Sequence, residues 1–432
     1  MDTAAFASPR HSRYHPTNAA PPTARHTSRG NLPIDTPPPY GPVRPDEIDA
    51  VARLAHHGFG LPRPIFDRYA DLFGVDRLRV LRATGPTGRC EPMACAAHWL
   101  VNQWFCGQPV STQAIAMVAV DPTRRGEGHG SALMRNLLAE GRAAGAAQAV
   151  LWPSTLPFYQ RLGFGRGGVA CRWSAPPALL TPLRGIEWDD GAILPADPRD
   201  ATPLAAIRRR MLEDGNGLIE RDETLWSLAL CPDGDPAALF LLTGPSGAEG
   251  YIALSPPQSR RLQVADLCAA TPRALQLARR LLSGYRAQAD HVVWRGGPDE
   301  SLPLLASDLG VELEQREEWL LRILDVRRAL TARAYPSDID TVVAFAINDP
   351  LFPENNQTFH LKVAKSKGEI ILCMNDNAPT ATLGIDAFSS LYSGHASAKA
   401  LWQAGLLYGK EKIIAPMERL FCGPRPWMVD RF

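Results

Sequence analysis

A glycine-rich loop between an apolar strand and an amphipathic helix constrains the fold of this chain more than any other feature. The run Ala114–Val120 is apolar nearly throughout, as a central strand covered on both faces would be. Asp121-Pro122 then marks a turn, and residues 125–130 read Arg-Gly-Glu-Gly-His-Gly. From Ser131 to Ala144, apolar residues recur four apart, which predicts a helix with one core-facing side. This order predicts an α/β (α+β) fold with a ligand site at the loop.

The loop has the composition of a cradle for an anion. Glycines at 126, 128 and 130 let backbone N–H groups turn toward a ligand without a Cβ in the way. The following helix adds its unpaired N–H groups and positive dipole end, and Arg125 adds donors suited to phosphate oxygens. The third glycine comes one residue too early for the dinucleotide motif, and no Lys-Ser or Lys-Thr follows as in an ATP-binding loop. The sequence therefore predicts a phosphate ligand of another kind.

Composition excludes several classes of protein. A chain of 432 residues corresponds to two to four domains at roughly 100–200 residues each. Lys and Arg total 46 against 45 Asp and Glu, a balance that argues against a general nucleic-acid or acidic-membrane binder. No apolar run approaches the ~18–20 residues of a membrane span, and the N-terminus lacks an apolar signal core. The eight cysteines form no Cys-x-x-Cys pair, so we expect buried thiols in a cytoplasmic protein.

Four sections are expected along the chain. Residues 1–45 are rich in Pro, Ala, Thr, Ser and Arg, which predicts a disordered or polyproline-like tail. A transit peptide is the alternative, although the prolines disfavour the amphipathic helix that it requires. The expected domains are 46–171, 172–318 and 319–432.

Periodicity and turn signals predict the main elements of these domains. Asp46 is the expected cap of the first helix, and Thr271 and Pro272 are expected at the start of the fourth. The expected helices are Asp46–His57, Ser131–Ala144, Asp200–Glu213, Ala274–Tyr285, Ala387–Tyr392 and Ser397–Ala404. The expected strands are Leu78–Ala83, Met93–Trp104, Ala114–Val120, Ala147–Trp152, Tyr251–Ser255, Leu262–Leu267, His291–Trp294, Trp319–Leu324 and Glu369–Met374.

The loop resembles the Arg-x-x-Gly-x-Gly signature of GCN5-related N-acetyltransferases, here Arg125-Gly-Glu-Gly128-His-Gly130. A Val-x-Val-x-Pro strand end precedes it, and Phe158-Tyr159-Gln-Arg-Leu-Gly-Phe164 resembles the short helix ahead of that family's penultimate strand. The alternative is a glycine-rich turn in an unrelated α/β fold, which would leave the second motif unexplained.

This resemblance implies that the co-substrate is acetyl-CoA and that no metal is needed. The strand before the loop would splay from its neighbour and pair with the pantetheine, the loop would hold the pyrophosphate, and the next strand end would open a slot for the thioester. The implied pantetheine-binding residues are Val118, Ala119 and Val120. The implied pyrophosphate-binding residues are Arg125, Gly126, Glu127, Gly128, His129, Gly130 and Ser131. Ser154 and Thr155 would lie at the thioester end.

The rest of the chain narrows the resemblance. The middle section looks like a second copy of the fold whose loop, Asp266–Arg273, lacks glycines and contains Pro272. An unrelated α+β domain is the alternative there. The last section resembles a sterol-carrier-like fold, through Asn348–Asn356, Gly384–Asp386 and Leu391–Gly394.

This order of domains resembles the Eis (enhanced intracellular survival) family of bacterial aminoglycoside and polyamine acetyltransferases. Glu317–Asp325 resembles that family's junction between its second and third domains, and Pro426–Phe432 resembles its terminal segment. The resemblance implies a homo-oligomer, a hexamer, that acetylates a small-molecule amine and binds neither nucleic acid nor membrane.

The same resemblance implies two catalytic residues. Tyr159 matches the family's tyrosine that protonates the coenzyme A thiolate, and packing at a helix start is the alternative role. The general base would be the terminal carboxylate of Phe432, a group with an ordinary pKa of about 3.3–3.7. Trp427 and the neighbouring prolines would stiffen the approach of this apolar segment, whereas a frayed tail is the default for any terminus.

Other candidates have weaker support from the sequence. His56 and His57 are expected on the surface at a helix end, and His129 is expected to act through its backbone. His98 could reach the acceptor cleft, although strand alternation explains it equally well. Trp99 and Trp104 could line that cleft or pack in the core. Asp189-Asp190 and Asp233/Asp235 stand in Gly/Pro contexts that indicate turns.

The leading hypothesis is therefore an acetyl-CoA-dependent N-acetyltransferase that acts on a primary amine such as an aminoglycoside or polyamine. The first alternative is a protein lysine or N-terminal acetyltransferase. The second is a carrier whose last domain binds an apolar ligand and whose first domain only regulates it. Aminoglycoside-modifying relatives gather acidic residues around their cleft, whereas Met93–Trp104 is apolar and aromatic. The sequence leaves the acceptor and the use of longer acyl groups open.

Overall fold

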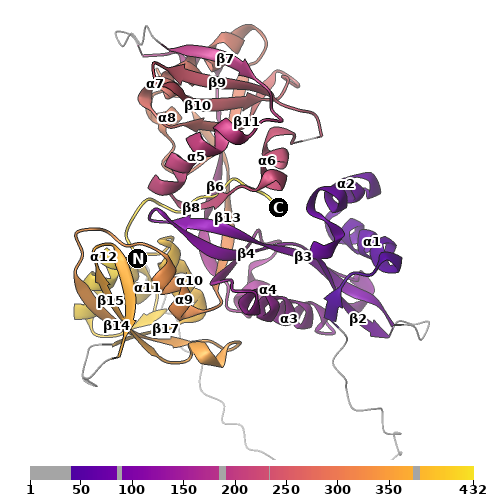
Figure 1. Cartoon of the computed structure of the whole chain (residues 1–432), viewed down its shortest axis with the longest axis vertical. Helices are drawn as coiled ribbons and strands as arrows, with labels where there is room; N and C mark the ends of the chain where they lie inside the picture. The colour runs from indigo at the N-terminus through magenta and orange to yellow at the C-terminus, as the bar shows by residue number, and fades with distance from the viewer. Residues whose placement is uncertain (1–39, 85–89, 184–190, 233, 373–379) are drawn as a thin grey trace, which may run out of the picture. The chain divides into compact units, whose positions relative to one another are not determined.

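The computed structural model describes residues 40–432 except 85–89, 184–190, 233 and 373–379. These described residues form one compact unit. Its described strands make one sheet of thirteen strands and a second of five (Figure 1). The mixed α/β fold predicted from the sequence is confirmed.

The first section carries the predicted strand, loop and helix. Its long central strands β3 and β4 form an antiparallel ribbon, and β5 joins β4 in parallel. In order, the elements are β1 (Tyr40–Pro42), η1 (Pro45–Glu47), α1 (Ile48–Phe59), α2 (Arg63–Phe73), η2 (Val75–Arg77), β2 (Leu78–Thr84), β3 (Cys90–Phe105), β4 (Gln108–Val120), η3 (Pro122–Arg124), α3 (His129–Ala143), β5 (Gln148–Leu151), α4 (Leu156–Gln160), β6 (Gly165–Ala175) and η4 (Pro177–Leu180).

The second section repeats the alternation of strands and helices seen in the first section, with shorter strands. Strands β7, β8 and β9 are not among those expected from the sequence, and they span only five, five and seven residues. Its elements are β7 (Ala192–Ala196), α5 (Thr202–Asp214), β8 (Asn216–Glu220), α6 (Glu223–Leu230), β9 (Ala238–Gly244), β10 (Gly247–Leu254), β11 (Arg261–Ala269), α7 (Pro272–Ser283), η5 (Gly284–Ala287), β12 (His291–Gly296), α8 (Ser301–Leu304) and β13 (Glu312–Ile323).

The third section builds its own sheet, in the order β16-β15-β14-β17-β18. The expected strand Glu369–Met374 ends early as β16, and its last two residues lie outside the described part of the chain. The elements are α9 (Val326–Ala332), β14 (Thr341–Asn348), η6 (Pro353–Asn355), β15 (Thr358–Ala364), β16 (Lys367–Ile371), β17 (Thr380–Gly384), α10 (Ile385–Ser393), α11 (Ala398–Gln403), β18 (Leu407–Tyr408), η7 (Glu411–Ile413) and α12 (Ile414–Leu420).

Strand β13 completes the sheet of the first section, although it comes much later in the sequence than the other strands of that section. It lies between β5 and β6 and is antiparallel to both, with Leu320 opposite Leu151 and Arg166. Strand β6 then pairs with β12, so the sheets of the first and second sections are continuous. The domain boundary predicted at 318/319 and the strand predicted at Trp319–Leu324 both cut this strand, whose first half is charged and whose second half is apolar. The structure shows one strand across that boundary.

Two expectations near the start of the fold are wrong. Residues 40–42, assigned to the tail, form β1 against β2, and the Tyr40 hydroxyl bonds to Glu140 on α3. Asp46 does not cap the first helix, because a 3₁₀ turn precedes α1 and its N-cap residue is Glu47. The Glu47 carboxylate does not cap α1: it accepts two bonds of 2.7 Å from Arg82 and one of 2.9 Å from the backbone N–H of Arg44, at the start of the 3₁₀ turn.

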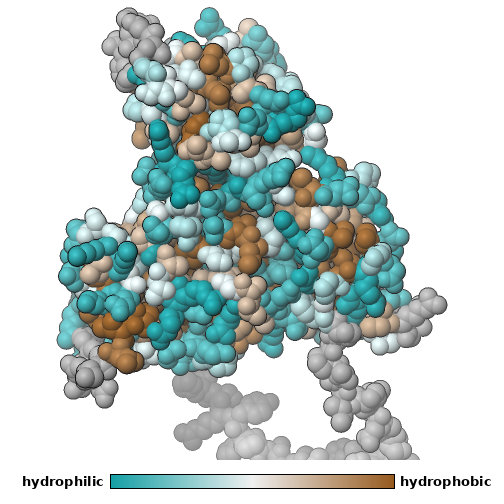
Figure 2. Space-filling model, viewed as in Figure 1, coloured by the Kyte–Doolittle hydropathy of each residue, from teal (hydrophilic) through white to brown (hydrophobic). Residues whose placement is uncertain are grey.

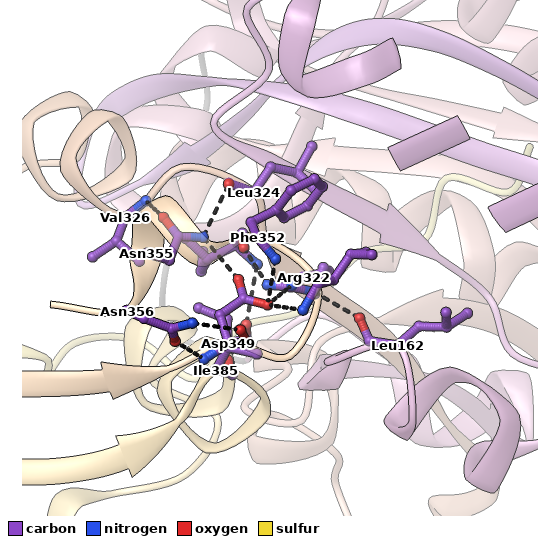
Figure 3. Close-up of polar contacts among 12 residues, drawn as sticks. Leu162, Arg322, Leu324, Val326, Asp349, Phe352, Asn355, Asn356 and Ile385 are labelled. Atoms are coloured by element: carbon purple, nitrogen blue, oxygen red, sulfur yellow. Dashed lines mark hydrogen bonds and ion pairs between the residues drawn. The ribbon is translucent and has the colours of Figure 1, made fainter. Parts of the chain in front are cut away.

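A buried ion pair fastens the third section to the first (Figure 3). Arg322 on β13 donates to Asp349 at 2.5 Å and to the carbonyl of Leu162, just after α4, at 2.8 Å. Asp349 also accepts from the amide of Asn355 at 2.8 Å. Since Arg322 and Asp349 are fully buried, the Asn348–Asn356 motif has a structural role at this junction.

Candidate active site

The glycine loop presents unsatisfied backbone donors to an open space. Gly126 and Gly128 have φ angles of 87° and 88°, which side chains rarely adopt, and a Cβ added at either would meet nothing within 4 Å. Helix α3 begins at His129 without a side-chain cap. Within the described part of the chain, the backbone N–H groups of residues 125–131 donate no hydrogen bond. These are the conditions under which a helix N-terminus binds an anion.

The charges around the loop leave one arginine free. Arg124 donates to Glu127 at 2.7 Å, and the His129 ring lies 3.2 Å from the same carboxylate. The side-chain hydrogen bond from Arg124 holds the pKa of Glu127 below its usual range, despite some desolvation. Arg125 is exposed and, among the described residues, makes no ion pair, so its guanidinium is available to a phosphate.

Strand β4 separates from β5 before it reaches the loop. The two strands pair only from Thr112 to Ile115, opposite Gln148 to Leu151. A bulge in the β3–β4 ladder and a positive φ of 53° at Met117 bend the strand at this point. The edge of residues 116–120 therefore faces an opening and not a neighbouring strand.

This opening leads into a cavity of about 900 Å³. Its walls come from the first section, from the second section and from the end of the chain. Among the lining residues are Trp99, Met117, Val118, Trp152, Ser154 and Tyr159, together with Arg221, Gln263, Arg295, Asp430, Arg431 and Phe432.

Tyr159 on α4 lies in the wall of this cavity, and its side chain is almost fully buried. Phe158 and Phe164 hold its ring edge to face, with centroids at 4.9 and 5.7 Å. Burial raises the pKa of Tyr159 to about 12, against a smaller lowering by a hydrogen bond with Ser154. The phenol is therefore protonated at neutral pH and can serve as a proton donor.

The last residues of the chain are packed into the same cavity. Met428 N donates to Val169 O at 3.0 Å, and Gly168 allows this approach because a Cβ there would meet Pro426 O at 2.5 Å. The Trp152 indole donates to Asp430 O at 3.0 Å. The ring of Phe432 meets that of Trp99 at 5.4 Å, nearly edge on.

A buried ionic network anchors this segment to the second section. Asp430 accepts from Arg208 at 2.9 Å and from Arg221 at 2.5 Å. Arg221 also binds Asp266, which accepts from the hydroxyl of Tyr251 at 2.7 Å. Burial alone would raise the pKa of Asp266, but the two guanidiniums hold it below its ordinary value. The second section therefore fixes the end of the chain that enters the cavity.

The structure brings some of the sequence-predicted residues together and separates others. Val118, Ser154, Tyr159 and Phe432 line one cavity. Residues 125–131 lie at the start of α3 and outside that lining, and Thr155 is the N-cap residue of α4.

The weaker candidates are also sorted. Trp99 lines the cavity, whereas Trp104 is buried outside its lining. His98 is also outside the lining: its ring lies 3.4 Å from Glu140 on α3 and 3.0 Å from Gln113. His56 and His57 are exposed at the end of α1, as predicted. Asp189-Asp190 and Asp233 lie outside the described residues.

The sequence analysis missed Trp152, the Asp430 network and Arg295 in the cavity wall. Asp430 lies more than two hundred residues from both Arg208 and Arg221 in the sequence, so no local motif joins the three. The two charged residues Asp430 and Arg431 within the otherwise apolar ending Trp-Met-Val-Asp-Arg-Phe were a hint of such a network.

The corresponding loop of the second section has no such cradle. The Thr271 side chain accepts from Ala274 N at 3.1 Å, and Pro272 has no N–H to offer. Thus the first turn of α7 is capped by its own chain.

Among the helices that the structure describes, none has the length and apolar character of a membrane span.

Comparisons with known families agree with the three sections. Residues 40–167 match the family described as an acetyltransferase (GNAT) domain, and residues 217–323 match a second family with the same description. Residues 326–429 match the sterol carrier protein domain family.

Known proteins match across most of the chain. An uncharacterized N-acetyltransferase of Streptomyces griseus is 27% identical over 354 residues, covering 76% of this chain and 83% of that protein. The crystal structure of a GCN5-related N-acetyltransferase from Anabaena variabilis shares the fold, with a TM-score of 0.84 at 23% identity, covering 91% of this chain and 100% of that one. Eis1 from Mycobacterium abscessus gives a TM-score of 0.72 at 25% identity, covering 90% of this chain and 98% of that one.

The chain thus has two acetyltransferase domains followed by a sterol carrier protein domain. It is an acyltransferase enzyme, an Eis-like GCN5-related N-acetyltransferase.

Proposed function

We propose that this enzyme transfers an acetyl group from acetyl-CoA to a primary amine of a small molecule. The observation that carries this proposal is the meeting of Val118, Tyr159 and Phe432 in the wall of one cavity. A strand edge, a protonated phenol and a chain terminus come there from three distant parts of the sequence.

Acetyl-CoA is placed by the open groups of the first domain. Arg125 and the free N–H groups of residues 125–131 bind its pyrophosphate, because the positive end of the dipole of α3 attracts an anion. The unpaired edge at Val118, Ala119 and Val120 hydrogen-bonds the pantetheine. Ser154 and Thr155, just past the end of β5, flank the thioester.

The transfer itself is direct. The amine nitrogen attacks the thioester carbonyl carbon, a C–N bond forms, and the C–S bond breaks. The departing thiolate takes the hydroxyl proton of Tyr159, which burial keeps in place well above neutral pH. The thiolate forms in the same buried cavity, where loss of solvent raises its affinity for a proton as well. Tyr159 then regains a proton from solvent.

The amine proton goes to the carboxylate of Phe432, directly or through water. A terminal carboxylate is an ordinary acid in water, but a surrounding of apolar rings favours its uptake of a proton. The ring of Phe432 is packed against Trp99, and the preceding Asp430 is held by two buried arginines. These contacts support a fixed position for the carboxylate.

A coenzyme A release assay tests this function. Purified protein at saturating acetyl-CoA is supplied with primary amines that include aminoglycosides, polyamines, amino acids and a peptide with a free N-terminus. We expect amine-dependent release of the thiol with at least one small molecule, and a matching acetylated product in the mass spectrum. The proposal is wrong if acetyl-CoA binds but no amine increases thiol release over the rate in buffer. Preference for the peptide would favour a protein acetyltransferase instead.

A further inference from the structure

Of the described residues that line the cavity, six are arginines and two are aspartates, and none is a lysine or a glutamate. Both aspartates, Asp266 and Asp430, are already bound by buried arginines. A ligand in this cavity therefore meets guanidinium groups and finds no free side-chain carboxylate.

Two of these arginines face each other across a strand pair. Arg295 on β12 lies directly opposite Arg172 on β6. Like charges at such positions share one face of the sheet and destabilise it. Arg172 is partly compensated, because its Nε lies 3.3 Å from Glu314, but Glu314 also binds Arg261.

Arg295 has no counter-charge of its own. Among the described residues its exposed side chain makes no hydrogen bond or ion pair, and it lies in the cavity wall. Partial desolvation by the cavity wall lowers the pKa of Arg295, and the charges of Arg431 and Arg172 lower it further, against an opposing effect of Glu317. Arg431 is paired with Glu317 and Arg172 with Glu314, so among these three arginines Arg295 alone makes no ion pair in the described part of the chain.

The arginine pair and the reacting groups belong to the same cavity. Arg431, whose charge lowers the pKa of Arg295, stacks over the Trp152 ring at 4.7 Å, and Trp152 follows directly after β5, two residues before Ser154. Aromatic side chains also line this cavity, including Phe73, whose ring packs on that of Trp99 at 4.7 Å. Figure 2 shows hydrophobic side chains exposed over α1 and α2, where Phe59 is 49% exposed.

We propose that Arg295 and Arg172 bind an anionic group of the acceptor, so that the preferred substrate is a primary amine with a carboxylate or phosphate at a distance from it. This inference rests on the proposed function and specifies its substrate class. A polycation would place a positive group against the arginines with no carboxylate side chain to receive it. An apolar or aromatic spacer would fit the wall between the two ends.

Three amines of equal length test the inference directly. 6-Aminohexanoate, hexylamine and 1,6-diaminohexane carry the same reacting amine and end in a carboxylate, a methyl group and an ammonium group. We expect kcat/KM to fall in that order, by about 10- to 100-fold from the first to the second, as loss of charge-assisted hydrogen bonds implies. 6-Aminohexyl phosphate separates a preference for phosphate from one for carboxylate.

Variants then assign the preference to Arg295. Arg295→Gln should remove most of the advantage of 6-aminohexanoate and leave kcat/KM for hexylamine within about twofold. Its melting temperature should not fall, since the substitution relieves the repulsion with Arg172. Arg295→Glu should favour 1,6-diaminohexane. Arg286→Gln removes an exposed charge outside the cavity lining and should change nothing.

Two outcomes overturn the inference while leaving the proposed function intact. They are equal kcat/KM values for the three amines, and an advantage of 6-aminohexanoate that persists in Arg295→Gln. If none of the three is acetylated, calorimetry decides: tighter binding of 6-aminohexanoate than of hexylamine, lost in Arg295→Gln, supports the inference, and equal or absent binding of both refutes it. Failure of every amine in the broader panel would instead reject the function itself.

Discussion

Replacing Asp430 by Asn should detach the end of the chain from the cavity without disturbing acetyl-CoA binding. The side chain of Asp430 is 3% exposed, and those of its partners Arg208 and Arg221 are each 2% exposed. The amide keeps the shape of the carboxylate but removes its charge. Arg221 retains Asp266, whereas Arg208 loses the one ion-pair partner it has in the described residues.

The magnitude follows from leaving a buried guanidinium uncompensated. Removal of one partner of a buried ion pair costs about 3–5 kcal/mol. At 1.4 kcal/mol per factor of ten, this shifts the balance between docked and undocked tail by about 10²- to 10³-fold or more. We expect kcat to fall at least about tenfold, with the dissociation constant of acetyl-CoA unchanged, because residues 125–131 are untouched.

The assay combines coenzyme A release, calorimetry with acetyl-CoA and limited digestion with a carboxypeptidase. The matched control is Asp299→Asn, which breaks an exposed ion pair between Arg425 of the same tail and the second domain. An exposed pair is worth about 0–1 kcal/mol, so the control should resemble the unaltered enzyme. The reasoning fails if Asp430→Asn keeps full turnover and protease resistance, or if the control loses as much.

Three further predictions concern the proposed site. Gly128→Asp should abolish acetyl-CoA binding, because a side chain and a negative charge enter the open space at this positive-φ glycine. Calorimetry should give one acetyl-CoA site per chain for the unaltered enzyme, and two sites would contradict the assignment. Tyr159→Phe should lower kcat by about 10²–10⁴-fold with little change in acetyl-CoA affinity, and normal turnover with chemistry rate-limiting would exclude the role. Since the raised pKa keeps this proton in place until about pH 12, no loss of rate at lower pH should depend on Tyr159, which a comparison of pH profiles would check. A C-terminal tag or deletion of Phe432 should inactivate the enzyme but spare acetyl-CoA binding, whereas an N-terminal tag should be harmless; full activity of the C-tagged protein would exclude Phe432 as base.

The parts of the site that local sequence encodes could be predicted, and the parts made by distant contacts could not. The glycine loop and Tyr159 lie within forty residues of each other in a fixed order of strand, loop and helix, so spacing alone places them. Arg295 reveals its role only when β12 is set beside β6, because a lone arginine in a short strand looks like an ordinary surface charge.

The same reason explains the errors in the fold. Strand β13 was divided because its first half alternates charges while its second half is apolar, a change that reflects two different neighbourhoods of one strand. The helix cap at Asp46 failed because a tertiary ion pair between Glu47 and Arg82 decided the local geometry.

The late position of β13 has a consequence for the synthesis of this enzyme. Strand β5 ends at Leu151, but the strand that lies beside it begins only at Glu312. At about 5–20 residues per second, a ribosome needs roughly 10 to 30 s to make the chain between them. During that interval the nascent catalytic domain exposes two strand edges that invite pairing with other chains. We therefore expect a fragment ending near Ala175 to aggregate, and the growing chain to depend on chaperones until β13 has emerged.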